Sequence, residues 1–146
     1  SAALWGVASA ASAQTYSRMV VFGDSLSDNG NIPVIGGGNN PPPPYYANHF
    51  SNGPTYAEDV AGALGLGALG HFGQTSGSVD WAVGGAETGT GNYGNAALPG
   101  MATEIGAYLG PYHGTVGSHD LVVLWGGAND VFANLPAAGA SSNPTG

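Results

Sequence analysis

Three polar clusters could carry chemistry in this sequence, and each follows a short apolar run. They read "GDSLSDNG" from Gly23, "GGAET" from Gly84 and "GGAND" from Gly126. The first contains Ser25, whose hydroxyl becomes a nucleophile when a neighbouring base removes its proton. Attack on a carbonyl also requires hydrogen-bond donors for the oxyanion that forms. A glycine N–H in "GGAET" and the side-chain amide of Asn129 in "GGAND" are donors of this kind.

The apolar runs before these clusters predict three strands, at residues 19–22, 79–83 and 121–125. The last run, "DLVVLW", is almost continuously apolar, which is typical of a parallel strand buried on both faces. Trp81 and Trp125 lie on these strands, and we expect both in the core. Ligands bind at the carboxyl ends of strands in open parallel sheets. We therefore expect the three clusters to meet in one crevice.

Two helices are predicted between the strands, which gives the alternation of a parallel α/β sheet. In "PTYAEDVAGALG", Thr55 and Glu58 have the spacing of a capping box, and apolar residues recur every fourth position at Tyr56, Val60 and Leu64. In "LPGMATEIGAYLGP" the corresponding face is Met101, Ile105 and Leu109. A third helix is expected to begin near Ala128.

The connection between the first strand and the first of these helices is unusually long and contains four consecutive prolines. Such a segment should be extended and partly polyproline II. Long loops of this kind often form lids or binding walls. Solvated linker is an equal alternative for residues 36–40. It is a poorer one for residues 41–50, because two tyrosines and a phenylalanine are costly to leave in water.

An ordinary turn is the alternative for the serine cluster. Its acidic residues Asp24 and Asp28 also raise phosphoryl or metal chemistry, but a D-x-D pattern would need an acid at position 26, where Leu26 stands. We expect both aspartates to shape the turn by accepting backbone N–H groups.

The composition narrows the range of partners. Arg18 is the only Lys or Arg against nine acidic residues, which gives a formal net charge of -8. Nucleic acid and anionic membranes are poor candidates, because the chain cannot neutralise a series of phosphates. Neutral or apolar substrates fit better. Cysteine is absent, and no cofactor or metal is implied.

The first 13 residues resemble the end of a secretory signal peptide, with Ala11-Ser12-Ala13 as the cleavage site. A disordered Ala/Ser-rich tail is the alternative. Residues 14–146 are then expected to form one domain of a protein that is secreted, periplasmic or displayed on the outer membrane.

The three clusters together resemble the blocks of the GDSL, or SGNH, family of serine esterases and lipases. "FGDSLSDNG" matches the first block, which implies Ser25 as nucleophile. "WAVGGAET" and "GGAND" match the second and third, which implies Gly85, rather than the alternative Gly84, and Asn129 as oxyanion donors. The resemblance implies a three-layer α/β/α, flavodoxin-like fold with a parallel sheet, present here incompletely.

A further stretch, "PPYYANHFSNGPTYAEDVA", is similar to the branch that holds bacterial secreted lipases, lipid acyltransferases and autotransporter esterases. In that branch a Gly-Arg pair stands where this chain has Asn48-His49. The role of that arginine therefore cannot be carried over directly.

The family takes its base from a D-x-x-H block, and no aspartate here has a histidine three residues later. We expect all four histidines to be surface residues or loop residues with satisfied hydrogen bonds. His119 precedes a strand and should lie at the opposite edge of the sheet, and His49 is the nearest candidate for a substitute base because its loop leaves the catalytic edge. The resemblance implies a carboxylic-ester hydrolase that acts on a small-molecule or lipid ester through an acyl-enzyme, with acyltransferase activity as a side reaction, and residues 14–146 as the N-terminal part of its domain. The alternative is an inactive fragment that serves as a binding or surface module, or as half of a two-chain enzyme.

Overall fold

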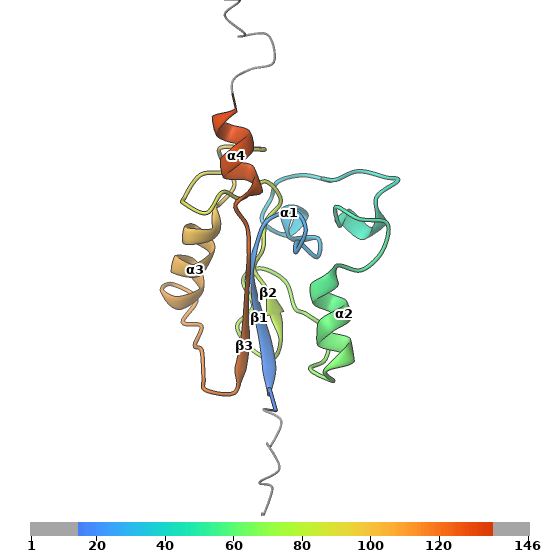
Figure 1. The fold of residues 1–146 in the computed structure, drawn as a ribbon, viewed down its shortest axis with the longest axis vertical. Helices are drawn as coiled ribbons and strands as arrows, with labels where there is room; N and C mark the ends of the chain where they lie inside the picture. The colour runs from blue at the N-terminus through green and yellow to red at the C-terminus, as the bar shows by residue number, and fades with distance from the viewer. Residues whose placement is uncertain (1–14, 136–146) are drawn as a thin grey trace, which may run out of the picture.

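The computed structural model describes residues 15–135, which form a three-stranded parallel sheet with helices on both faces (Figure 1). The strands are β1 (Arg18–Gly23), β2 (Val79–Asp80) and β3 (Asp120–Trp125), in the order β2-β1-β3. The predicted strand 79–83 is shorter by this definition, but Trp81 and Val83 still donate backbone hydrogen bonds to Val21 and Gly23 of β1. The predicted three-layer α/β/α class is therefore confirmed.

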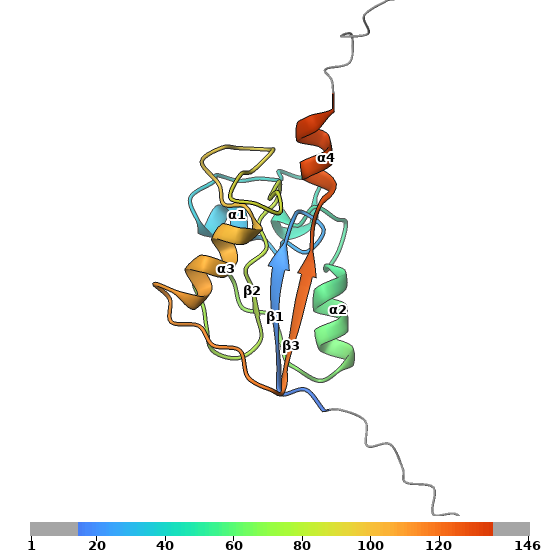
Figure 2. The same ribbon diagram turned by 60° about the vertical axis from the view of Figure 1, so that its left-hand side comes forward.

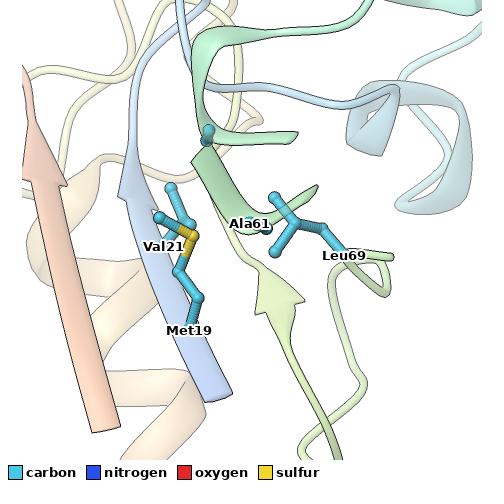
Figure 3. Packing of buried hydrophobic residues seen from close by; sticks show 5 residues of the cluster. Met19, Val21, Ala61 and Leu69 are labelled. Atoms are coloured by element: carbon cyan, nitrogen blue, oxygen red, sulfur yellow. The ribbon is translucent and has the colours of Figure 1, made fainter. Parts of the chain in front are cut away.

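The central strand β1 divides the core into two halves. Met19 and Val21 pack toward α2 (Tyr56–Ala63), together with Ala57, Ala61 and Leu69 (Figure 3). The alternate residues, Val20 and Phe22, pack on the other face with Trp81 and Tyr108. Tyr108 belongs to α3 (Met101–Leu109), which covers that face of the sheet (Figure 2). The two-residue period of the strand therefore supplies both layers at once.

The remaining elements lie around the carboxyl ends of the strands. They are α1 (Asn31–Val34), the 3-10 helix η1 (Tyr46–Asn48) and α4 (Ala128–Asn134), which begins at the position predicted for the third helix. Figure 1 shows α1 and α4 at the end of the sheet toward which the strand arrows point. Among residues 15–135, no helix is both long enough and apolar enough to cross a membrane.

The predicted start of α2 is confirmed, but of its expected apolar face only Tyr56 packs against the core. The Thr55 side chain accepts a hydrogen bond from the Glu58 N–H, and the Glu58 side chain accepts one from the Thr55 N–H. Ala57 and Ala61 are fully buried, whereas Val60 and Leu64 are 38% and 49% exposed. Small side chains let the helix approach β1 closely, and this contact outweighs the pattern of larger residues.

The predicted face of α3 is confirmed only in part. Met101 is buried and Ile105 packs against the core, but Leu109 is 53% exposed. The other buried positions are Glu104 and Tyr108, three and seven residues after Met101. A carboxyl group therefore takes a core position on this helix.

The prediction that the third strand is buried on both faces is also wrong. β3 pairs only with β1 among the described residues, and Val122 and Leu124 are 37% and 59% exposed. Trp125, expected in the core, is 50% exposed and contacts Tyr56, whereas Trp81 is fully buried as expected. Leu121 and Val123, on the α2 face, are partly buried.

Arg18 anchors the amino end of the sheet. Its guanidinium donates to Asp120 through Nε at 2.9 Å and Nη2 at 2.7 Å, and to the carbonyl oxygens of Thr75 and Thr115. The only basic side chain of Lys or Arg type is therefore at the end of the sheet opposite the serine cluster.

The close contact between α2 and β1 predicts that Ala61→Leu destabilises the protein. A larger side chain there must push the helix from β1, at a cost of roughly 1–3 kcal/mol in the free energy of unfolding. Urea unfolding would measure it, with Val60→Leu on the exposed face as the matched control. Equal stability of both variants would contradict the assignment of the buried face.

Candidate active site

Ser25 lies in a turn that directly follows β1, and Asp24 holds that turn. The Asp24 N–H donates to the Trp125 carbonyl oxygen at 3.1 Å, and its side chain accepts from the Leu26 N–H at 3.0 Å. The backbone N–H groups of Ser27 and Asp28 donate to the Asp24 carbonyl oxygen. Ser25 itself is partly exposed, and its hydroxyl makes no hydrogen bond to another residue in 15–135.

Asp28 connects this turn to the second cluster. One carboxylate oxygen accepts from the N–H groups of Gly30 and Asn31, and the other accepts from the Gly84 N–H at 2.8 Å. Both aspartates of the first cluster thus accept backbone N–H groups, as predicted. Burial raises the pKa of Asp28 to about 6, against the lowering effect of these hydrogen bonds.

The two glycines of the second cluster differ in the use of their N–H groups. The Gly84 N–H is taken by Asp28, whereas the Gly85 N–H has no acceptor within residues 15–135. Gly85 has a φ of +84°, and a Cβ there would also collide with the Asn92 side chain and the Gly94 backbone. Only glycine fits this position without strain. Gly85 is therefore the better placed donor of the pair.

Asn129, in the first turn of α4, joins the third cluster to the second. Its Nδ2 donates to the Ala86 carbonyl oxygen at 2.9 Å, which uses one of the two amide hydrogens. The neighbouring Asp130 accepts from the Thr88 N–H and hydroxyl. The second amide hydrogen of Asn129 is left for another acceptor.

The three predicted site residues line one cavity of about 320 Å³. Ser25, Gly85 and Asn129 share it with Gly84, and no charged side chain lines it. The long loop after α1 contributes Gly37, Asn40 and Phe50, while the remaining walls are Tyr93, Gly94, Asn95 and Leu98. The predicted convergence of the clusters is thus seen in the structure.

The loop prediction holds only for part of residues 41–50. Phe50 lines the cavity, but Tyr45 and Tyr46 are each 48% exposed. Their rings contact Phe50 and His49, respectively, rather than entering the core.

The histidines contact other partners than Ser25. His49 is buried, with Nε2 2.9 Å from a Glu58 carboxylate oxygen and Nδ1 3.0 Å from the Ala47 carbonyl oxygen. Both ring nitrogens thus face oxygens, and neither is free to accept a proton from a serine. His71 contacts Asn29, and His119 lies at the amino end of β3 near Thr15, as expected.

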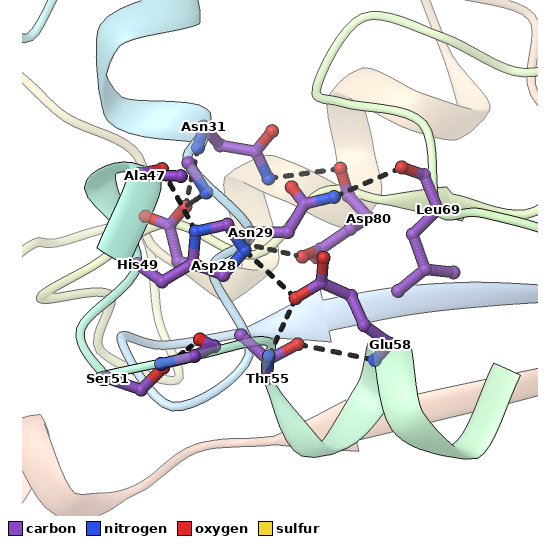
Figure 4. A network of polar contacts seen from close by, with 12 residues as sticks. Asp28, Asn29, Asn31, Ala47, His49, Ser51, Thr55, Glu58, Leu69 and Asp80 are labelled. Atoms are coloured by element: carbon purple, nitrogen blue, oxygen red, sulfur yellow. Dashed lines mark hydrogen bonds and ion pairs between the residues drawn. The ribbon is translucent and has the colours of Figure 1, made fainter. Parts of the chain in front are cut away.

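A buried polar network lies beside the serine turn, and sequence reasoning missed most of it (Figure 4). Asp80 accepts from the N–H groups of Asn29 and Ala82, and the Asn31 amide donates to the carbonyl oxygens of Asp80 and Ala82. Burial raises the pKa of Asp80 well above its usual range. The sequence carried one signal for this network, because its polar residues lie in or beside apolar runs in a chain with very few charged residues.

Glu104 is the second missed carboxyl. It accepts from the Gly23 N–H at 3.0 Å and the Val83 N–H at 3.2 Å. Burial raises its pKa to about 9. Within residues 15–135, no three His, Asp or Glu side chains come together in a group that could hold a metal ion.

Fold and cavity together define an α/β protein with its ligand site at the carboxyl end of a parallel sheet. A family model described as GDSL-like Lipase/Acylhydrolase matches residues 19–145, so the chain belongs to this family, which is one of ester hydrolases in general. No curated protein gives a match. The family assigned by resemblance is thereby confirmed. The roles of Ser25, Gly85 and Asn129 stay predictions, and residues 1–13, expected to be a signal-peptide remnant, lie outside the described part.

The buried carboxyls predict a protein that loses stability as the pH rises. Asp28, Asp80 and Glu104 hold protons in the folded state at pH values where the unfolded chain has released them. The free energy of unfolding should therefore fall from about pH 4, where the unfolded carboxyls ionise, to about pH 9, the raised pKa of Glu104. Asp28 alone should contribute on the order of 3 kcal/mol to this fall, between about pH 4 and pH 6. Urea unfolding across this range would measure it, and a flat or rising profile would refute the expectation.

Proposed function

We propose that this protein is a carboxylic-ester hydrolase in which Ser25 is the nucleophile. The observation that carries the proposal is that Ser25, Gly85 and Asn129 line one and the same cavity, which has no charged residue among its described lining residues. Within residues 15–135 the Ser25 hydroxyl and the Gly85 N–H have no hydrogen-bond partner, and the Asn129 amide uses one of its two hydrogens. Uncharged walls suit a neutral ester rather than a carboxylate or phosphate.

In the proposed reaction, the Ser25 oxygen bonds to the ester carbonyl carbon while a base takes the hydroxyl proton. The carbonyl oxygen becomes an oxyanion, which the Gly85 N–H, the Asn129 amide and the Ser25 N–H would hold. Collapse breaks the bond to the alcohol, which leaves with the proton, and the acyl group stays on Ser25. Water then releases the acid, and a second alcohol in place of water would make the reaction an acyl transfer.

Labelling with a fluorophosphonate tests the nucleophile. We expect the intact mass to show one adduct on the protein, absent from Ser25→Ala and retained in Ser27→Ala, the matched control two residues away. Asn129→Ala should slow labelling by about 10²–10³-fold, the usual effect of removing one oxyanion donor. Continued labelling of Ser25→Ala would refute the assignment.

The source of the base is a second proposal, carried by the exposed apolar edge of β3. The exposed residues of β3 there are Val122, Leu124 and Trp125. Further exposed apolar side chains are Val131 and Phe132 of α4 and Leu135 directly after it. We propose that further protein, in the same or a separate chain, covers this edge and supplies the base. Apolar strand edges of this kind are rarely left uncovered.

The proposal predicts that the 146-residue chain associates through this edge when studied alone. Sedimentation should show oligomers at micromolar concentration, reduced by Leu124→Lys and unchanged by Val116→Lys. Val116 is an exposed apolar residue outside β3, 49% exposed against 59% for Leu124. A monomeric chain would contradict the proposal that the exposed edge of β3 is a contact surface. Ester hydrolysis by the isolated chain that Ser25→Ala abolishes would show that no added base is needed.

A further inference from the structure

Glu104 carries a buried carboxyl group that takes no part in the proposed reaction. It projects from α3 into the core with no exposed surface, and its two oxygens accept from the N–H groups of Gly23 and Val83. Gly23 ends β1, and Val83 makes the last backbone hydrogen bond that joins the β2 segment to it. The carboxyl thus lies where the two strands part.

Parting strands leave buried N–H groups that need an acceptor. The Val83 N–H is shared between the Gly23 carbonyl oxygen and Glu104, while the Gly23 N–H donates to Glu104. A buried N–H without an acceptor costs about 1–3 kcal/mol. Glu104 therefore fixes how far the strands can separate.

The positions of these two N–H groups connect Glu104 to the site. Gly23 stands two residues before Ser25, and Val83 stands two residues before Gly85. We propose that Glu104 is a positioning residue that sets the spacing between the Ser25 hydroxyl and the Gly85 N–H. This inference rests on the proposed function, because it assigns these two groups to one reaction.

The charge state of Glu104 provides a signature for the test. Desolvation raises its pKa to about 9, and the negative fields of Asp80 and Asp28 add to the effect. The two backbone hydrogen bonds oppose it. Arg18, the only Lys or Arg, is bound to Asp120 at the opposite end of the sheet. Ionisation of Glu104 should therefore occur in the alkaline range and strengthen both hydrogen bonds that it accepts.

The first measurement is the rate of Ser25 labelling by a small fluorophosphonate, followed by intact mass on the complete protein, with the proposed base-supplying part present. Glu104→Gln retains one acceptor oxygen but turns an NH₂ group toward the other N–H, and Glu104→Leu removes both acceptors. We expect a loss of roughly 10-fold for Glu104→Leu, because the Gly23 N–H is left without an acceptor while the Val83 N–H keeps the Gly23 carbonyl oxygen. The loss should be smaller for Glu104→Gln. The control is Asp59→Asn, which removes one carboxylate from an exposed position of α2 and should label at the wild-type rate.

The second measurement is an NMR titration of the wild-type chain, which does not depend on a variant that folds. The Glu104 carboxyl carbon should titrate near pH 9, and the amide nitrogens of Gly23, Val83, Ser25 and Gly85 should shift with the same midpoint. In Glu104→Gln these coupled shifts should vanish. A purely structural contact would change stability without moving the Ser25 and Gly85 signals together.

The outcomes separate the two proposals. Labelling of Ser25 at equal rates in wild type and both Glu104 variants, with no coupled titration, overturns the role of Glu104 and leaves the proposed function intact. Failure of the wild type to label at Ser25 when the proposed base-supplying part is present overturns the proposed function, and the positioning role falls with it. Slower labelling of Glu104→Gln together with the coupled titration supports both.

Discussion

Hydrogen bonds from backbone N–H groups to buried carboxyls hold the loops at the carboxyl end of the sheet in place. Asp28 accepts from Gly84, Asp80 from Asn29 and Ala82, and Glu104 from Gly23 and Val83. A chain with one Arg and no Lys cannot hold these loops with ion pairs to such residues. The peptide dipoles provide the positive ends instead, and all of these bonds except the local one from Ala82 to Asp80 join segments that are distant in sequence.

This arrangement explains why Gly84 and Gly85 act differently although they are adjacent and chemically identical. Asp28 accepts the Gly84 N–H, whereas the Gly85 N–H has no acceptor within residues 15–135. Of the two N–H groups, the described part of the chain therefore uses only the Gly84 N–H to hold the loop. Gly84 thus has a structural role, whereas its neighbour Gly85 has the proposed catalytic role.

The clusters and their convergence could be predicted from the sequence, because apolar runs that end in small polar residues report directly on strand ends. The buried face of α2 could not be predicted, because alanines contribute little to an apolar pattern. Ala57 and Ala61 nevertheless form this face, since their small side chains let the helix lie close to β1. The exposure of Trp125 could not be predicted either, because the local sequence does not reveal that β3 lies at the edge of the described sheet. The burial of Glu104 could not be predicted, because an acidic residue on a helix usually faces solvent. Its hydrogen-bond partners also lie some 20 and 80 residues away in the sequence.

The raised pKa values also bear on the proposed oxyanion. Three ionised carboxylates beside the cavity would oppose the build-up of negative charge on an ester oxygen. Burial raises the pKa of Glu104 to about 9, so this carboxyl is neutral at neutral pH, and burial also raises the pKa of Asp80. The three N–H donors to Asp28 offset the charge that it carries once ionised. Burial thus reduces the negative charge that the acidic chain places near Ser25. The burial that costs stability as the pH rises is thus also what makes this site compatible with an anionic intermediate.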